Sequence, residues 1–241
     1  MDRRATEGTL LIELAERLLE YRFVRRRRRS IGITVDGGGL RVAAPLRAPW
    51  REVEAFLRAK ERWILAKLDE WARVAPAPLL QGASGERLPL FGEPRELEVR
   101  RGRRGVHDDG VRLVVCARQG ARPLPVLVAW LKQRALDALA PRVAHYAARL
   151  GQPTPRVALS HARSQWGLCT EEAVIRLSWR LVHVAPTLAD YVVAHEVAHL
   201  VELNHSRRFW SVVSELYPAW REARERLELA GASLPILKGQ P

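Results

Sequence analysis

Two histidines and one glutamate inside an apolar segment constrain the fold of this chain more than any other feature. His195, Glu196 and His199 fall within residues 186–200, where most other side chains are apolar. Residues four apart lie on one face of an α-helix, so the two imidazoles can bind the same metal ion. Burying these three polar groups without a partner costs free energy, and a metal supplies that partner. The sequence therefore predicts a helix from Pro186 that carries a metal site.

The predicted site needs a third protein ligand and a group that activates water. His205 is the leading third ligand, because Asn204 before it can adopt the left-handed conformation that ends a helix. Zn²⁺ is the expected metal, with water in its open fourth position. Glu196, next to His195, can act as general base on that metal-bound water. Two other candidates for the third ligand stay open: Glu202, and Glu215 on a helix predicted over residues 206–216.

The sequence excludes the metzincin arrangement of this kind of zinc site. Metzincins also place a third histidine six residues after the second, but they turn on a glycine and hold a methionine beneath the metal. This chain has Glu202 at the glycine position, and its single methionine is Met1.

The residues around this segment resemble the YgjP-like metallopeptidase family, which is related to SprT-like zinc proteases. The resemblance is carried by residues 195–200, by Asn204-His205-Ser206 and by Phe209-Trp210. Upstream, Ser-Gln-Trp-Gly-Leu-Cys-Thr at residues 164–170 is similar to the family element Ser-Arg-Trp-Gly-Ser-Cys-Ser, with three departures. The resemblance implies a minigluzincin-type core, with zinc ligands at His195, His199 and His205 and Glu196 as the catalytic acid/base.

Three further residues are candidates for substrate contact. Trp166 and Gly167 can form an edge strand beside the cleft, where an extended peptide would add as another strand; a core tryptophan followed by a turn glycine is the alternative. Tyr217 is a candidate for oxyanion stabilisation. His161 and Arg163, just before this segment, are weaker candidates.

The sequence pattern of the whole chain predicts an α+β fold with two parts. We expect an N-terminal β-rich basic subdomain with helices over residues 1–120. The C-terminal part, residues 121–241, is expected to be a minigluzincin-like zincin domain with a small antiparallel sheet and the active-site helix, which Thr187 would cap. The expected elements are helices at 9–22, from Pro49 and at 126–150, a hairpin at 31–42, and strands at 87–91, 96–99, 111–116, 156–160 and 174–179.

Charge gives a second indication of partners. The chain has 40 Lys+Arg against 27 Asp+Glu, a formal net charge of +13, and the densest basic run is Arg25–Arg29. Such a run attracts phosphate. Beside a peptide or protein substrate, we therefore keep a nucleotide or nucleic acid, bound through the arginine-rich N-terminal half, as an alternative partner. A solvated basic strand is the other interpretation of the run.

Composition excludes several classes of protein. Hydrophobic residues make up 47% and charged residues 28%, as in globular domains. No apolar stretch approaches the roughly 18 residues of a membrane span. The two cysteines, Cys116 and Cys169, are too few for a disulfide framework. Residues 1–20 interleave glutamates with leucines, unlike a secretory signal, so we expect a cytoplasmic protein.

The predicted function is a zinc-dependent hydrolase, specifically a metallopeptidase in which Glu196 activates the metal-bound water. One alternative is a metal-dependent hydrolase of nucleotide phosphoanhydrides, with arginines binding the phosphates. A second alternative is a nucleic-acid-associated protein whose zinc is structural. An open fourth position on the metal distinguishes catalysis from a purely structural site.

Overall fold

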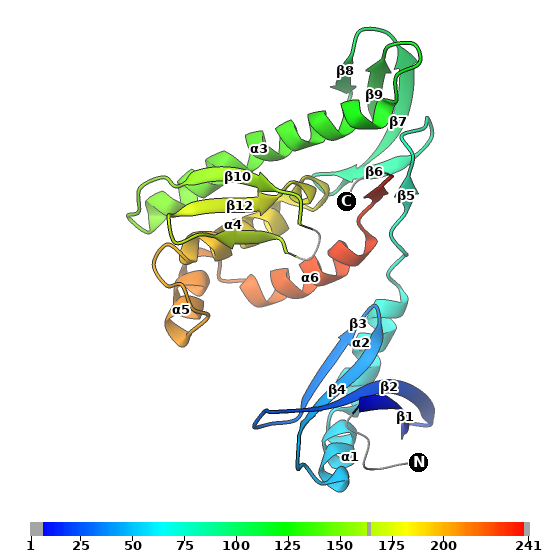
Figure 1. Ribbon diagram of the computed structural model, residues 1–241, viewed down its shortest axis with the longest axis vertical. Coiled ribbons are helices and arrows are strands. Elements are labelled where there is room, and N and C mark those ends of the chain that lie inside the picture. Colours follow the sequence, from blue (N-terminus) through cyan, green and yellow to red (C-terminus); the bar gives the residue numbers. More distant parts are fainter. Residues whose placement is uncertain (1–6, 163–164, 239–241) are drawn as a thin grey trace. The chain divides into compact units, whose positions relative to one another are not determined.

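The computed structural model describes residues 7–162 and 165–238, and the fold is α+β, as predicted (Figure 1). The chain separates into two compact units, residues 1–75 and 76–241. The division differs from the predicted boundary at residue 120. Strands of the segment 79–117 share a hydrophobic core with helix α3 (Pro123–Arg149), through side chains such as Leu88, Leu113 and Leu127. They therefore belong to the C-terminal unit.

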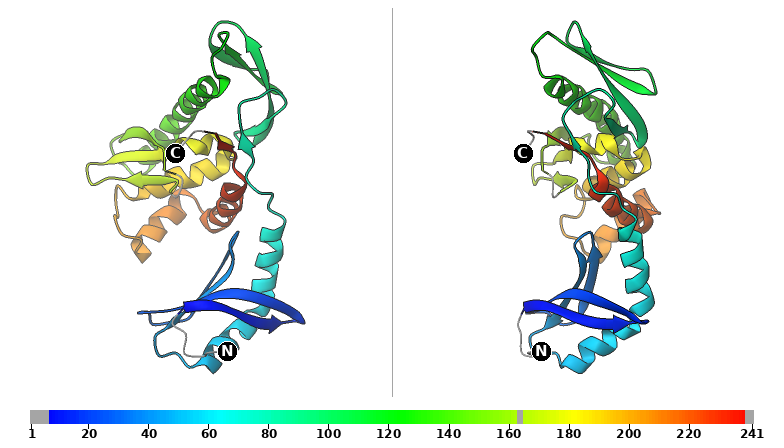
Figure 2. Two further views of the ribbon diagram at one scale, coloured as in Figure 1. Left: turned by 45° about the vertical axis from the view of Figure 1, so that its right-hand side comes forward. Right: turned by 90° about the vertical axis from the view of Figure 1, so that its right-hand side faces the viewer.

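The N-terminal unit is a four-stranded sheet packed against two helices. The strands are β1 (Glu7–Leu14), β2 (Arg17–Arg26), β3 (Gly32–Asp36) and β4 (Gly39–Pro45), in the order β1-β2-β4-β3. β2 and β4 run parallel, and the other pairs are antiparallel. Helices α1 (Trp50–Ala59) and α2 (Glu61–Ala72) lie on one side of the strands (Figure 2). Their core residues Val53, Leu57 and Ile64 are fully buried against the sheet.

The helix predicted over residues 9–22 is wrong, because this segment forms the β1–β2 hairpin. In β1 the apolar side chains alternate with outward residues: Ile12 and Leu14 are buried, whereas Leu11 is exposed. Leu18, which the predicted helix placed on its apolar face, is exposed on β2. Ala15 and Glu16 form the turn with positive φ angles of 44° and 64°. Positive φ at both turn residues is typical of a tight two-residue hairpin. The hairpin predicted over residues 31–42 is confirmed. The single helix predicted from Pro49 is instead two helices, α1 and α2, which are separated at Lys60.

The first part of the C-terminal unit is a second four-stranded sheet. Its strands are β6 (Arg87–Leu90), β7 (Glu93–Arg101), β8 (Gly105–Asp108) and β9 (Arg112–Ala117), in the order β6-β7-β9-β8. Three of them confirm predicted strands, and β8 was not predicted. A short ladder between β5 (Leu79–Leu80) and β13 (Ile236–Leu237) joins the beginning and the end of the unit.

The remainder of this unit builds the surroundings of the predicted site. The strands β10 (Arg156–Ser160), β11 (Gly167–Cys169) and β12 (Val174–Ser178) form a sheet in the order β10-β12-β11. The predicted antiparallel sheet is wrong in one respect, because β10 runs parallel to β12 and only β11 is antiparallel. A 3₁₀ helix (Trp179–His183) leads to α4 (Pro186–Ala198), which is followed by α5 (Arg207–Leu216) and α6 (Trp220–Ser233). Helix α4 packs against α3, α5, α6 and strands β11 and β12.

Helix α4 begins one residue earlier than its predicted cap. Ala185 is the N-cap residue and Pro186 the first helical residue, so the prediction of Thr187 as the cap is wrong. Proline suits this first position because the backbone N–H that it lacks would have no partner within the helix. Across the described residues, no helix is both long and apolar enough to cross a membrane.

Candidate metal centre

The C-terminal half of α4 presents two imidazoles on one face. His195 and His199 are one helical turn apart, and their ring centroids are 5.2 Å from each other. Between them Glu196 is buried, with 6% of its surface exposed. The helix itself is almost wholly buried, so the three polar side chains are fixed on a rigid element.

The chain turns back after α4 and brings the third histidine to the first two. His205 Nε2 lies 3.1 Å from His195 Nε2, and one nitrogen of each of the three histidines lies within 4.8 Å of the others. Two nitrogens bound tetrahedrally to zinc at 2.0–2.1 Å would be about 3.3 Å apart, so the distance between His195 and His205 fits zinc. His199 Nδ1 is hydrogen-bonded to the carbonyl of Glu202 at 3.1 Å, which leaves its Nε2 lone pair for a metal.

The turn that positions His205 differs from the predicted one. Asn204 does not adopt the left-handed conformation. Instead, the Ser206 N–H donates to the Asn204 carbonyl at 2.7 Å, and the Ser206 hydroxyl accepts from the Phe209 N–H at 3.3 Å. Ser206 is thereby the N-cap of α5, so the next helix begins two residues after His205.

A buried aromatic ring underlies all three imidazoles. The Phe209 ring is fully buried and stacks on His199 with centroids 4.5 Å apart. It also meets His195 at 4.9 Å and His205 at 4.7 Å, edge to face. Trp210 beside it stacks on Trp220 of α6 at 4.2 Å. The aromatic packing restricts the imidazole rotamers and holds the three nitrogens together.

Burial keeps the imidazoles of α4 neutral. It lowers the pKa of His195 to about 3, with smaller contributions from His199 and His205, and it also lowers the pKa of His199. Neutral imidazole is the form that binds a metal. Burial also raises the pKa of Glu196 to about 7.

Gly167 lies directly against the Glu196 carboxylate. A Cβ atom at position 167 would come within 2.5 Å of Glu196 Cγ and Oε1, so only glycine lets strand β11 approach this closely. Trp166, half-buried, packs on α6 at Gly231, where an added Cβ would meet its ring at 2.8 Å. The structure thus brings the predicted Trp166-Gly167 pair to the side of α4 that carries Glu196.

Other sequence candidates lie outside the cluster. Tyr217 lies beside Tyr191, with ring centroids 6.1 Å apart, and Tyr191 in turn contacts His195. Neither Glu202 nor Glu215, the alternative third ligands, belongs to the histidine cluster. The Glu202 carboxylate faces Arg208 at 4.0 Å. Of the described residues, only the three histidines form a group suited to a metal. Arg163 and Ser164 lie outside the described residues.

Two hollows adjoin the cluster. One, of about 240 Å³, is lined by Trp166, Tyr191, Glu196, Arg224 and Glu228, among others. The other, of about 650 Å³, is lined by residues 152–156, 169–173 and 199–203 (with Glu202 excepted). Tyr191 lies four residues before His195, so helical spacing would have found it. Arg224 and Glu228 gave no signal in the sequence, because α6 reaches the site only through tertiary packing.

The geometry is that of a metal-dependent hydrolase site. One nitrogen from each of three imidazoles lies within 4.8 Å of the others, and α4 also carries the buried carboxylate of Glu196. The family model described as YgjP-like, metallopeptidase domain, matches residues 29–230. The chain belongs to the YgjP-like metallopeptidase family, which confirms the resemblance found in its sequence, and it is in general terms a hydrolase of the zinc metallopeptidase type. No curated protein and no solved structure matches the chain.

Proposed function

We propose that this chain hydrolyses peptide bonds with a zinc ion held by His195, His199 and His205, and that Glu196 is its general base. The observation that carries the proposal is the convergence of the three histidine nitrogens within 4.8 Å of one another, next to a buried carboxylate on the same helix. When bound, zinc supplies a Lewis acid that polarises a carbonyl and makes water more acidic.

Glu196 performs the proton transfers in this proposal. Its carboxylate accepts the proton of the attacking water and delivers a proton to the leaving amine. The backbone of Gly167 limits the positions open to the carboxylate, because it packs against Cγ and Oε1. Helix α4 and the edge of the sheet together hold the base in place before substrate binds.

Strand β11 supplies a binding edge for an extended substrate. It is an edge strand of its sheet, since its neighbour is β12 and β12 is followed by β10. The Trp166 carbonyl and the Thr170 N–H bond to β12, at 2.8 and 3.0 Å. The alternation of an antiparallel ladder therefore turns the N–H and C=O groups of Gly167 and Cys169 toward the open edge. A peptide that pairs there would pass directly beside Glu196.

The charges around the cluster favour a peptide over a nucleoside triphosphate. The two hollows carry the carboxylates of Glu171, Glu172 and Glu228 in addition to Glu196. Two arginines also line the hollows: Arg224 faces Glu228 at 3.6 Å, and Arg156 shares the larger hollow with Glu171 and Glu172. Carboxylates repel a polyphosphate, whereas an uncharged peptide backbone is not affected.

Metal reconstitution with parallel substrates tests the proposal. Protein stripped of metal is given one equivalent of Zn²⁺ and incubated with unstructured proteins, with quenched fluorescent peptides and with nucleoside triphosphates. We expect peptide cleavage that depends on zinc and no release of phosphate or pyrophosphate. Hydrolysis of a nucleotide without peptide cleavage would overturn the proposal.

A further inference from the structure

The arginine run of the sequence forms an exposed cluster at one end of the N-terminal unit. Strand β2 ends at Arg26, and the next three arginines connect it to β3. We define the arginine cluster as five exposed side chains: Arg26, Arg27, Arg28, Arg29 and Arg47. In the parts of the chain that the structure describes, none of the five forms an ion pair.

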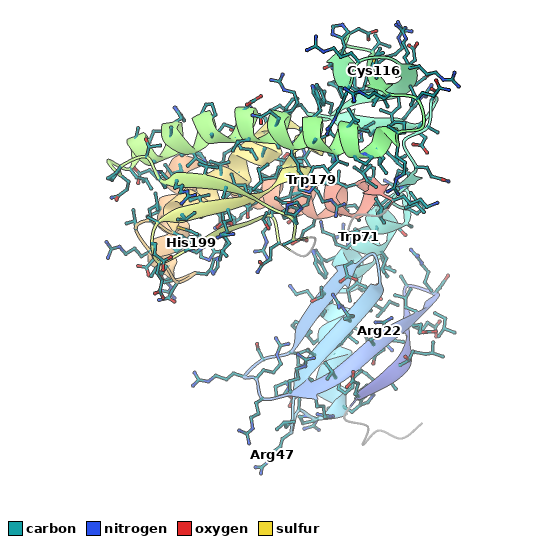
Figure 3. All side chains as sticks on the ribbon, turned by 45° about the horizontal axis from the view of Figure 1, so that its top comes forward. Arg22, Arg47, Trp71, Cys116, Trp179 and His199 are labelled. Carbon is teal, nitrogen blue, oxygen red and sulfur yellow. The ribbon has the colours of Figure 1, made fainter. Side chains whose placement is uncertain are left out.

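Arg25 belongs to the arginine run but not to the arginine cluster. Its hydrogen bonds explain why Arg47, which follows another strand, lies in the cluster. Arg25 Nη1 donates to the carbonyls of Pro45, Leu46 and Ala48, at 3.1, 3.3 and 2.8 Å. The guanidinium thereby fixes the loop after β4 against the end of β2. Because β2 and β4 are parallel and Arg26 lies opposite Pro45, the loops that follow the two strands lie at the same end of the sheet. Figure 3 shows Arg47 projecting from this end of the unit.

Acidic residues are sparse in the sequence around the cluster, and the nearest outside it are Glu20, Asp36 and Glu52. Residues 21–35 and 37–51 contain no Asp or Glu, and the intervening Asp36 is bonded to Arg41. Five like charges at one end of a small unit repel one another, and a bound polyanion would relieve that repulsion. The guanidinium group forms paired hydrogen bonds with phosphate oxygens.

We propose that the arginine cluster binds the phosphate backbone of a nucleic acid, without reading its bases. This binding is separate from the hydrolytic site and goes beyond the proposed function. The cluster consists of loop and strand-end side chains, which can contact phosphates but insert no helix into a groove. An anionic membrane is the less favoured partner, because Leu46 is the one large apolar side chain exposed within the two loops of the cluster, at 53%.

The proposal predicts a strong dependence on salt. Five arginines can neutralise up to about five phosphates, which for a duplex corresponds to a slope of about −4.5 in a plot of log K against log salt, and for a single strand to about −3.5. Raising the salt from 50 to 200 mM would then weaken binding to the duplex by about 500-fold. Partial engagement of the cluster would give a proportionally smaller slope.

Fluorescence anisotropy with a labelled single strand and a labelled duplex, each of mixed sequence, tests the proposal on the full-length protein. The cluster variant carries Arg26→Gln, Arg27→Gln, Arg28→Gln, Arg29→Gln and Arg47→Gln. A matched control removes five exposed arginines of the C-terminal unit: Arg101→Gln, Arg103→Gln, Arg104→Gln, Arg118→Gln and Arg122→Gln. Both variants lose five positive charges, and both leave Arg25 in place.

We expect the cluster variant to bind at least tenfold more weakly with a shallower salt slope, and the control to stay within about threefold of the unmodified protein. Equal weakening in both variants, no binding to either nucleic acid, or a flat salt response would overturn the proposal. Binding confined to phosphatidylserine vesicles would also overturn it. The single variants Arg27→Gln and Arg47→Gln provide the same test if the fivefold variant fails to fold, because each alone should weaken binding and reduce the slope by about one.

Discussion

Replacing Gly167 with alanine tests whether the catalytic site depends on the close approach of β11 to Glu196. The new Cβ would lie 2.5 Å from Glu196 Cγ, whereas ordinary contact begins at 3.4 Å, so the carboxylate or the strand must move by about 1 Å. Neither moves freely, because Glu196 is buried and β11 is paired with β12. A misplacement of this size costs on the order of 100-fold in rate. The added methyl should also cost about 1–3 kcal/mol of stability.

The assay for this prediction is kcat on a peptide substrate, together with the zinc content and the urea midpoint of the same preparation. We expect kcat to fall about 100-fold while zinc stays bound, since none of the three histidines moves. Gly105→Ala is the matched control: Gly105 likewise begins a strand, and its Cβ would meet the nearest atom only at 4.0 Å. If the Gly167→Ala protein has an unchanged kcat, the close approach of β11 to Glu196 does not matter for catalysis.

Three further predictions follow from the same structure. His205→Ala should lose zinc while Glu202→Gln retains it, as metal analysis after dialysis will show; the reverse result would make Glu202 the third ligand. Phe209→Ala should reduce the free energy of unfolding by about 3–5 kcal/mol, because its ring is fully buried under the imidazoles, and denaturant titration measures this loss. Burial lowers the pKa of His183 to about 4, so the unfolded chain is protonated first as the pH falls. Stability should therefore be full above about pH 6.5 and decrease toward pH 4, by roughly 3 kcal/mol in total; His183→Asn should remove this part of the pH dependence, and the exposed His107→Asn should not.

The candidate site was largely predictable because its ligands are local in sequence. Helical spacing places His195 and His199 together, and the short distance to His205 limits where the chain can turn. The turn was predictable only in part. Ser206 follows the ordinary N-cap pattern and accepts from the N–H three residues on, whereas the hydrogen bond from the Ser206 N–H to the Asn204 carbonyl has no sequence signal. Arg224 reaches the site from a distant helix, and only tertiary packing brings it there.

The prediction of the fold was wrong where a local sequence pattern is compatible with both a helix and a strand. Leu10, Leu14 and Leu18 are spaced as on a helix, but Leu10 and Leu14 also fit one face of a strand, and Leu18 is exposed on β2. The turn at Ala15-Glu16 contains neither glycine nor asparagine. The compact units divide after residue 75, and not at residue 120, for a different reason. The strands of residues 79–117 belong to the C-terminal unit only because their apolar side chains pack on α3, a long-range contact without a sequence signal.

In the proposed mechanism three histidines hold zinc and Glu196 carries the proton. Measuring kcat and zinc stoichiometry on one preparation of the Glu196→Gln protein tests both roles together. We expect about one zinc per chain and a kcat lower by about 10²–10⁴-fold, because the amide keeps the shape of the side chain and cannot accept the proton. If the Glu196→Gln protein keeps its zinc and cleaves peptides at the unmodified rate, Glu196 is not the general base.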